Sequence, residues 1–164
     1  MIGLGLIGGS VALALRERGW HVSGDDLDAV TARTALERGV VDALGLDTDA
    51  EITFVAVPVL VAVDQVKRAL AETNGIVTDV GSVKAAVCAG ASDTRFVGGH
   101  PMAGSELDGL EGAQADLFEG AVWVLTPGVD SDDTVFAGVA AVVASFGAEV
   151  VALSPERHDQ LVAV

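Results

Sequence analysis

The feature that most constrains the fold is a glycine-rich turn near the amino terminus, where residues 3–8 read GLGLIG. The run matches G-x-G-x-x-G and leads directly into residues 10–15, which have helical character. In such a turn the first glycine permits the tight bend, the second lets a pyrophosphate approach the backbone, and the third lets the helix pack on its strand. The helix start adds amide donors and a partial positive charge. Alone the motif is a weak signal, so its context decides.

Apolar, β-branched runs alternate with helix-like segments along the rest of the chain. This alternation is typical of βαβ units with a parallel sheet buried on both faces. We therefore predict a Rossmann-like, doubly wound α/β fold with a mainly parallel sheet. The expected strands span residues 20–24, 52–57, 76–79, 96–99, 121–125 and 149–153, and the expected helices span residues 9–18, 28–38, 60–72, 109–117 and 132–146. Asp28 and Asp132 suit helix starts, and Gly39 and Gly147 suit helix exits.

An acidic pair ends the expected strand at residues 20–24. Asp25 and Asp26 follow the glycine turn by roughly 20 residues, the spacing at which a carboxylate binds the adenosine ribose. Such a carboxylate repels a 2′-phosphate, so NAD is favoured over NADP. In this fold the carboxyl end of the strand at residues 52–57 also faces the cofactor. The predicted cofactor-binding residues are Gly3, Gly5, Leu6, Ile7, Gly8, Asp26, Val57, Pro58 and Ser82.

Composition and charge exclude several classes of binding partner. The 164 residues suit one domain, and a formal charge of −15 argues against binding to nucleic acid or to an anionic membrane. The single cysteine, Cys88, excludes an internal disulfide and argues against a cysteine-based metal site, so we expect no metal. The sequence contains no long uncharged apolar run and no basic segment followed by an apolar one. We therefore expect a soluble, cytoplasmic protein.

Two segments have compositions that packing does not require. Residues 78–84 read TDVGSVK and place Ser82 and Lys84 at the expected start of a helix near the crevice of the sheet. Residues 98–106 read GGHPMAGSE, so small residues flank His100 on both sides. A core histidine normally has bulky apolar neighbours, whereas small ones let a ligand approach the backbone. This pattern favours a catalytic role for His100.

Together, residues 3–10, 79–84, 99–106 and 117–121 resemble the prephenate/arogenate dehydrogenases in order and approximate spacing, and residues 154–159 resemble the segment that closes their nucleotide-binding domain. The resemblance implies an enzyme of tyrosine biosynthesis that oxidatively decarboxylates prephenate to 4-hydroxyphenylpyruvate and passes hydride to the nicotinamide. It also implies that His100 hydrogen-bonds the ring hydroxyl of the substrate and accepts its proton. A neutral imidazole suits that task near pH 7. Ser82 matches the serine that orients hydroxyl, histidine and nicotinamide.

The resemblance has consequences for domain organisation. We expect residues 1–153 to form the dinucleotide-binding domain and residues 154–164 to begin a connecting helix. The chain opens with little of a first strand, and the family's helical domain, which dimerises and supplies an arginine for the substrate carboxylate, is absent from this sequence. We therefore expect the full-length protein to be a homodimer and this chain to be inactive alone. His158 and Asp159 are expected to act in capping or at an interface, and Lys84 in anchoring or cofactor contact.

Three alternatives stay open at this point. The substrate can be arogenate rather than prephenate, since the groups that distinguish their side chains fall outside this sequence. Another Rossmann dehydrogenase of the β-hydroxyacid type would share the glycine turn, but it would not require the segment around His100. A non-catalytic dinucleotide-binding module is the third alternative, and the presence of both Ser82 and His100 argues against it.

Overall fold

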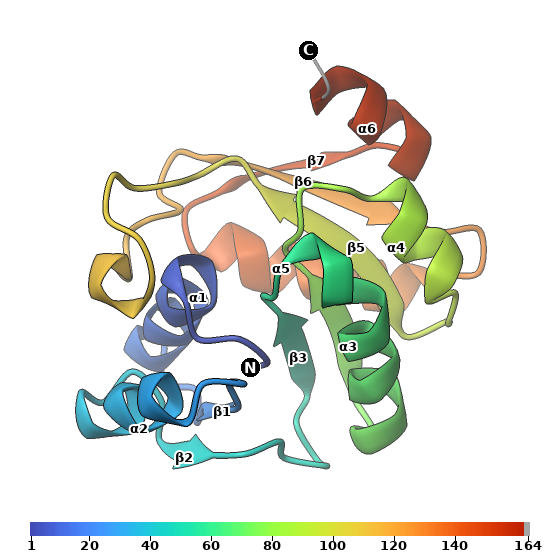
Figure 1. Cartoon of the computed structure of the whole chain (residues 1–164). Coiled ribbons are helices and arrows are strands. Elements are labelled where there is room, and N and C mark those ends of the chain that lie inside the picture. Colours follow the sequence, from blue (N-terminus) through green and yellow to red (C-terminus); the bar gives the residue numbers. More distant parts are fainter. Residues whose placement is uncertain (163–164) are drawn as a thin grey trace.

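The computed structural model describes residues 1–162, and a five-stranded sheet forms its centre (Figure 1). The sheet has the order β3-β4-β5-β6-β7, and its strands are β3 (Ile52–Val55), β4 (Ile76–Asp79), β5 (Phe96–Pro101), β6 (Val122–Pro127) and β7 (Glu149–Ala152). All neighbouring strands are parallel except β5 and β6, which are antiparallel. The prediction of a mainly parallel sheet is therefore confirmed.

A smaller parallel pair, β1 (Ser23–Gly24) and β2 (Ala43–Leu44), lies beside this sheet. Ile2 forms parallel bridges with Asp25 on one side and Val55 on the other. Across all strands the order is therefore β2, β1, Ile2, β3, β4, β5, β6, β7. The chain winds outward in both directions from Ile2, which is the switch point of a doubly wound fold.

Helices cover both faces of the sheet: α1 (Leu6–Glu17), α2 (Ala29–Glu37), α3 (Val59–Glu72), α4 (Ala85–Gly90), α5 (Asp133–Ser145) and α6 (Pro155–Val162). One apolar core packs α1 and α5 against an aromatic group of Phe54, Phe118, Trp123 and Phe146, in which the centroids of contacting rings lie between 4.9 and 6.4 Å apart. A second core packs α3 and α4 on the opposite face. Burial on both faces explains why the strands read as continuous apolar runs.

The predicted helix starts at Asp28 and Asp132 are confirmed. Each side chain accepts a hydrogen bond from the amide two residues on, at 3.1 Å from Val30 and 2.7 Å from Thr134. These bonds satisfy amides that the first helical turn leaves unpaired. Within residues 1–162 no helix is long and apolar enough to cross a membrane.

The predicted helix at residues 109–117 is wrong, because only the 3₁₀ turn η1 (Leu110–Gly112) forms there. Gly109 has φ 65° and ψ −162°, outside the helical region. The amide of Gln114 donates to the Ser10 hydroxyl at 3.0 Å rather than to a helical carbonyl. A tertiary hydrogen bond to α1 thus replaces the helical ladder expected from local pattern.

Several strand boundaries also differ from the prediction. The strand expected at residues 20–24 pairs only at Ser23–Gly24, and the two-residue β2 was not predicted. The strand expected to end at Gly99 continues to Pro101, because β6 pairs with His100 and Pro101 from the other side. His100 therefore lies inside a strand rather than in the loop after it.

Candidate active site

The candidate residues meet at one edge of the sheet. The glycine turn follows Ile2, Asp26 follows β1, Pro58 follows β3, Ser82 follows β4, and His100 lies near the end of β5. The carboxyl ends of parallel strands share an edge, so the fold brings these segments to the same side of the molecule. The sequence pattern predicted this convergence through the alternation of strands and helices.

The three glycines of the turn meet different surroundings. Gly3 has φ 87°, and a Cβ there would lie 2.2 Å from the Ala56 carbonyl oxygen. A Cβ at Gly8 would lie 2.0 Å from the Gly3 carbonyl oxygen. At Gly5, by contrast, a Cβ would meet nothing within 4 Å. Packing therefore explains Gly3 and Gly8, whereas Gly5 leaves bare backbone facing open space, as a bound ligand requires.

The start of α1 supplies donors beside that space. Gly5 is the N-cap and makes no side-chain capping bond, and the first turn carries no acidic residue. The first helical hydrogen bond runs from the Gly9 amide to the Gly5 carbonyl at 2.8 Å. The amides of Leu6, Ile7 and Gly8 thus have no partner within the helix. Free amides at a positive helix end fit an anionic group such as a pyrophosphate.

Asp26 borders the same turn. Its carboxylate accepts hydrogen bonds from the Leu4 amide at 2.7 Å and the Asp28 amide at 2.9 Å. Asp25 instead forms an ion pair with Arg68 of α3, at 2.8 Å. Both residues hydrogen-bond the glycine turn, Asp25 through its backbone carbonyl to the Gly3 amide at 2.8 Å, but only Asp26 does so through its carboxylate.

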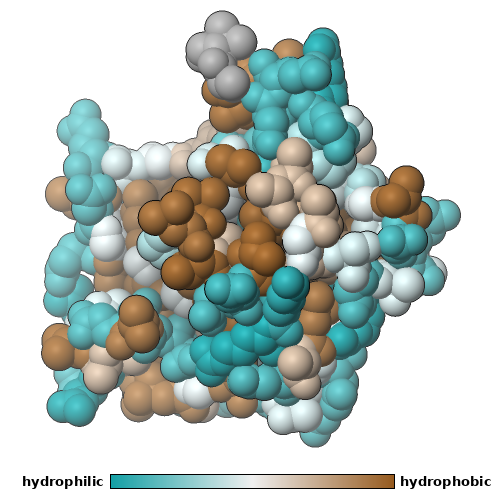
Figure 2. All heavy atoms as spheres, turned by 45° about the vertical axis from the view of Figure 1, so that its right-hand side comes forward, coloured by the Kyte–Doolittle hydropathy of each residue, from teal (hydrophilic) through white to brown (hydrophobic). Residues whose placement is uncertain are grey.

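Exposed apolar side chains flank this edge. Leu27, directly after Asp26, and Leu60, in the first turn of α3, are almost fully exposed. Both belong to segments that follow strands at the carboxyl edge of the sheet. Figure 2 shows a face of the molecule on which apolar side chains gather near the middle, with a group of hydrophilic side chains directly below them. Apolar walls beside polar groups are typical of cofactor clefts, and sequence reasoning did not single out either leucine.

A buried ion pair fixes the backbone next to His100. Lys84 is fully buried, pairs with Asp79, and donates a hydrogen bond to the Gly99 carbonyl at 2.8 Å. Asp79 in turn accepts hydrogen bonds from the Gly99 amide at 3.2 Å and the Gly81 amide at 2.9 Å. Both backbone groups of Gly99 are therefore held by one ion pair. Of the two roles expected for Lys84, the geometry supports anchoring.

A chain of hydrogen bonds leads from His100 to α6. His100 Nδ1 lies 2.9 Å from His158 Nε2, and His158 Nδ1 lies 2.8 Å from Asp159 Oδ1. The Asp159 carboxylate also accepts the amides of Lys84 at 2.8 Å and Ala85 at 2.9 Å. His158 is fully buried. Asp159 therefore caps α4, as expected of the pair, while His158 contacts the candidate catalytic residue.

Electrostatics keep His100 neutral. Burial lowers the pKa of His100 from 6.5 to about 4, His158 and Lys84 act in the same direction, and Asp159 opposes them. The pKa of Asp159 is itself lowered: burial raises it, but hydrogen bonds from the Lys84 and Ala85 amides and from His158 outweigh burial. Near pH 7 the site thus pairs a neutral imidazole with an ionised carboxylate, and a neutral imidazole can accept a proton.

Ser82 lies in the loop between β4 and α4, and its side chain is exposed. It precedes α4 by three residues, so the expectation that it lies at the helix start holds only approximately. Strands β4 and β5 are parallel neighbours, with Thr78 opposite Val97. The loop after β4 and the end of β5 are therefore adjacent along the edge, which places Ser82 on the same side as His100.

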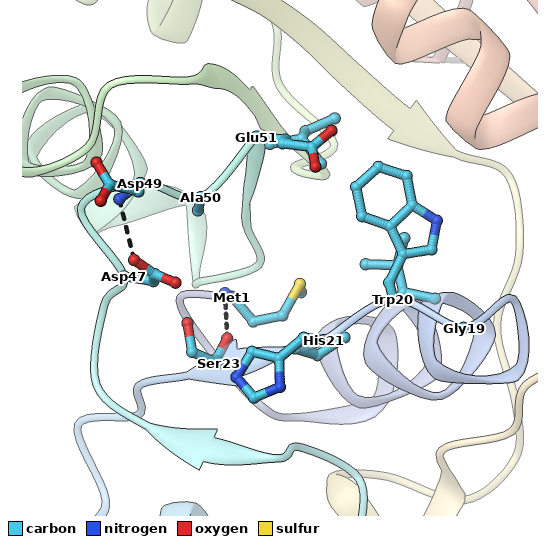
Figure 3. Close-up of a pocket in the computed structure, with 12 residues that line it drawn as sticks. Met1, Gly19, Trp20, His21, Ser23, Asp47, Asp49, Ala50 and Glu51 are labelled. Atoms are coloured by element: carbon cyan, nitrogen blue, oxygen red, sulfur yellow. Dashed lines mark hydrogen bonds between the residues drawn. The ribbon is translucent and has the colours of Figure 1, made fainter.

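A cavity away from these residues lies at the opposite edge of the sheet. It measures about 420 Å³ and is lined at the amino ends of β1 and β3 by Met1, Trp20, His21, Ser23 and Glu51 among others (Figure 3). The Met1 amino group donates to the Ser23 carbonyl at 2.7 Å, and burial lowers its pKa to about 6. None of the candidate residues lines this cavity. This cavity therefore does not coincide with the candidate active site.

The strand order, the glycine turn and the acidic residue after β1 define a dinucleotide-binding domain of the dehydrogenase class. A family model described as the nucleotide-binding domain of prephenate dehydrogenase matches residues 11–152. The chain belongs to the prephenate dehydrogenase family.

Individual relatives agree with this assignment. Prephenate dehydrogenase of Bacillus subtilis is 36% identical, and the match covers the whole chain and 48% of the relative. The crystal structure of Synechocystis arogenate dehydrogenase is 37% identical with a TM-score of 0.93, covering 99% of this chain and 61% of that one. Prephenate dehydrogenase of Aquifex aeolicus, in complex with hydroxyphenyl propionate and NAD+, is 30% identical with a TM-score of 0.92, covering 99% and 62%. The chain spans about half the length of the curated relatives it matches.

Proposed function

We propose that this chain is the nucleotide-binding part of an NAD-dependent dehydrogenase that converts prephenate to 4-hydroxyphenylpyruvate by oxidative decarboxylation, a step of tyrosine biosynthesis. The observation that carries the proposal is the neutral imidazole of His100, anchored through His158 at the same sheet edge as the glycine turn. A base held beside a dinucleotide site is what removal of hydride from a hydroxyl-bearing carbon requires.

The cofactor would be held by residues whose surroundings fit it. The pyrophosphate would lie against Gly3, Gly5 and the free amides of Leu6, Ile7 and Gly8. Asp26 would accept the ribose hydroxyls, and its charge would disfavour the 2′-phosphate of NADP. Val57, Pro58 and Ser82 would border the nicotinamide end. When bound, the nicotinamide ring supplies the hydride acceptor.

The chain's own residues handle the proton and the geometry. His100 accepts the proton of the ring hydroxyl as hydride leaves the carbon that bears this hydroxyl. The Ser82 hydroxyl orients the substrate hydroxyl toward His100. The ring carboxylate then leaves as carbon dioxide, and the electron pair of the broken bond completes the aromatic ring and places negative charge on the former hydroxyl oxygen. This oxygen takes the proton back from His100 to give the hydroxyl group of 4-hydroxyphenylpyruvate. Beyond this return of the proton by His100, the last step needs no further acid or base from the chain, so positioning is the main contribution of the protein.

The competing candidates rest on weaker observations. Arogenate is the substrate class in the name of the Synechocystis neighbour, so it is the first alternative. Solved 3-hydroxyacyl-CoA and 3-hydroxybutyryl-CoA dehydrogenases are only 18–20% identical and share the fold alone. A non-catalytic binding module would not need a neutral His100 fixed by a buried hydrogen-bond chain.

We also propose that residues 1–153 form the dinucleotide-binding domain and that α6 (Pro155–Val162) begins the connection to a helical domain. Residues 163 and 164 of the segment predicted from the sequence lie outside the described residues. That domain would supply the arginine for the substrate carboxylate and the contacts of a homodimer in the cytoplasm. A chain without it would bind NAD but not turn over substrate.

Nicotinamide reduction by the full-length protein tests the proposal, with prephenate and arogenate compared in the presence of NAD or NADP. We expect prephenate-dependent NADH formation. Turnover of arogenate alone would select the first alternative. NAD binding without turnover of either compound would favour the non-catalytic module and contradict the proposal.

A further inference from the structure

The hydrogen-bond chain between Asp159 and His100 has a defined direction. A carboxylate only accepts hydrogen bonds. Asp159 already accepts hydrogen bonds from the backbone amides of Lys84 and Ala85. His158 Nδ1, 2.8 Å from Asp159 Oδ1, must therefore carry a proton. In a neutral His158 the other ring nitrogen, Nε2, is then an acceptor.

The same logic extends one residue further. When His158 is neutral, its Nε2 accepts from His100 Nδ1 at 2.9 Å, so His100 Nδ1 is the donor. The remaining nitrogen of a neutral His100, Nε2, is then unprotonated. Within residues 1–162 this nitrogen has no hydrogen-bond partner. Because His158 is fully buried, water cannot replace either of its two hydrogen-bond partners.

We propose that His158 and Asp159 are positioning residues that fix His100 as the tautomer whose Nε2 can accept the substrate proton. The catalytic role of this tautomer rests on the proposed function, whereas the position of the proton on His100 does not depend on that function. Second residues that orient an imidazole in this way fix both its tautomer and its ring plane.

The chain also prepares His100 for the charge that it gains. Once Nε2 is protonated, Nδ1 still donates to His158, and the Asp159 carboxylate lies further along the same line. The charged and titratable groups around His100 are His158, Lys84 and Asp159, with Asp79 paired to Lys84. Of these, Asp159 favours the imidazolium through its negative charge, Lys84 opposes it through its positive charge, and His158 opposes it when it is itself protonated. Asp159 also caps α4, so the same carboxylate holds the backbone at Lys84 and Ala85, directly after the loop that carries Ser82.

A matched pair of variants tests the proposal in the full-length protein. His158→Gln keeps an oxygen near Nε2 that can accept from His100, and His158→Met has nearly the same shape but no comparable acceptor. We expect His158→Met to lower kcat by about 10- to 100-fold, the scale seen when a supporting partner of an imidazole is lost. The KM for prephenate and the Kd for NAD should change little. His158→Gln should recover about tenfold of that loss. Equal kcat values for folded Gln and Met variants would overturn the proposal.

A second measurement does not require turnover. With ¹⁵N-labelled histidine, imidazole NMR reports which ring nitrogen of His100 carries the proton. We expect the proton on Nδ1 in the unmodified protein and in His158→Gln, and a mixture of tautomers in His158→Met. A proton on Nε2 of neutral His100 in the unmodified protein would overturn the inference, even if prephenate is turned over. The expected tautomer without prephenate turnover would instead contradict the proposed function and leave the positioning intact.

Discussion

At the residue scale, the ionisation of His100 links the site to the stability of the fold. Its pKa is about 4 in the folded chain and 6.5 when unperturbed, so the unfolded state binds more protons between these values. His100 therefore contributes stability above pH 6.5 that is lost as the pH falls toward 4. We expect the free energy of unfolding to fall across this window, measured by denaturant titration. The free energy of unfolding of His100→Asn should fall less steeply with decreasing pH. Equal pH slopes for the variant and the unmodified protein would contradict the low pKa of His100.

Asp26 offers a second prediction at this scale. Asp26→Ser should weaken binding of NAD more than binding of NADP, because we propose that this carboxylate accepts the ribose hydroxyls and repels a 2′-phosphate. Calorimetric titration with each cofactor measures the effect. Asp25→Ser is the matched control, since Asp25 is held by Arg68 instead. Equal losses for both cofactors in Asp26→Ser would count against the assignment of Asp26.

Single residues were predictable where local pattern carried the signal. The small neighbours of His100 and the place of Asp26 after a strand are both visible in the sequence. The partners of His100 are not, because His158 lies 58 positions away and meets it only through the packing of α6. Asp79 and Lys84 were within a recognised segment, but their grip on Gly99 depends on the pairing of β4 with β5.

At the element scale, two glycines of the turn have different predicted roles: Gly8 is needed for packing, and Gly5 for binding of the cofactor. A Cβ at Gly8 would collide with the Gly3 carbonyl, whereas a Cβ at Gly5 would meet open space. Gly8→Ala should therefore destabilise the fold by about 1–3 kcal/mol, as overpacking does. Gly5→Ala should leave the thermal unfolding midpoint nearly unchanged and weaken NAD binding. If Gly5→Ala bound NAD with unchanged affinity, the result would contradict the proposal that the pyrophosphate lies against this turn.

Elements with a strong local signal were predicted well. The helices that begin after Asp28 and Asp132 start at their caps, and the strand at Ile76–Asp79 has the predicted bounds. The helix at residues 109–117 failed because two glycines and a hydrogen bond to Ser10 outweigh an apolar pattern. The two-residue β2 gives too short a run for any periodicity, and only its pairing with β1 defines it.

At the scale of the whole molecule, an acidic chain must bind an anionic cofactor. The net charge of −15 opposes any dinucleotide at long range, so attraction has to be local. In the proposed site, the open backbone at Gly5 and the free amides of α1 would provide this local attraction. The two ends of this arrangement, the turn after Ile2 and the imidazole on β5, are brought together only by the doubly wound sheet. Family membership and fold were therefore predictable, whereas the support of the site was not.

The most direct test of the central claim is turnover by His100→Asn in the full-length protein, with NAD affinity measured on the same preparation. Because His100 is the proposed base at a site separate from the glycine turn, kcat should fall by about 100-fold or more while the Kd for NAD stays within error. Thermal unfolding of the variant serves as the control for folding. Unchanged prephenate-dependent NADH formation by folded His100→Asn would contradict the account.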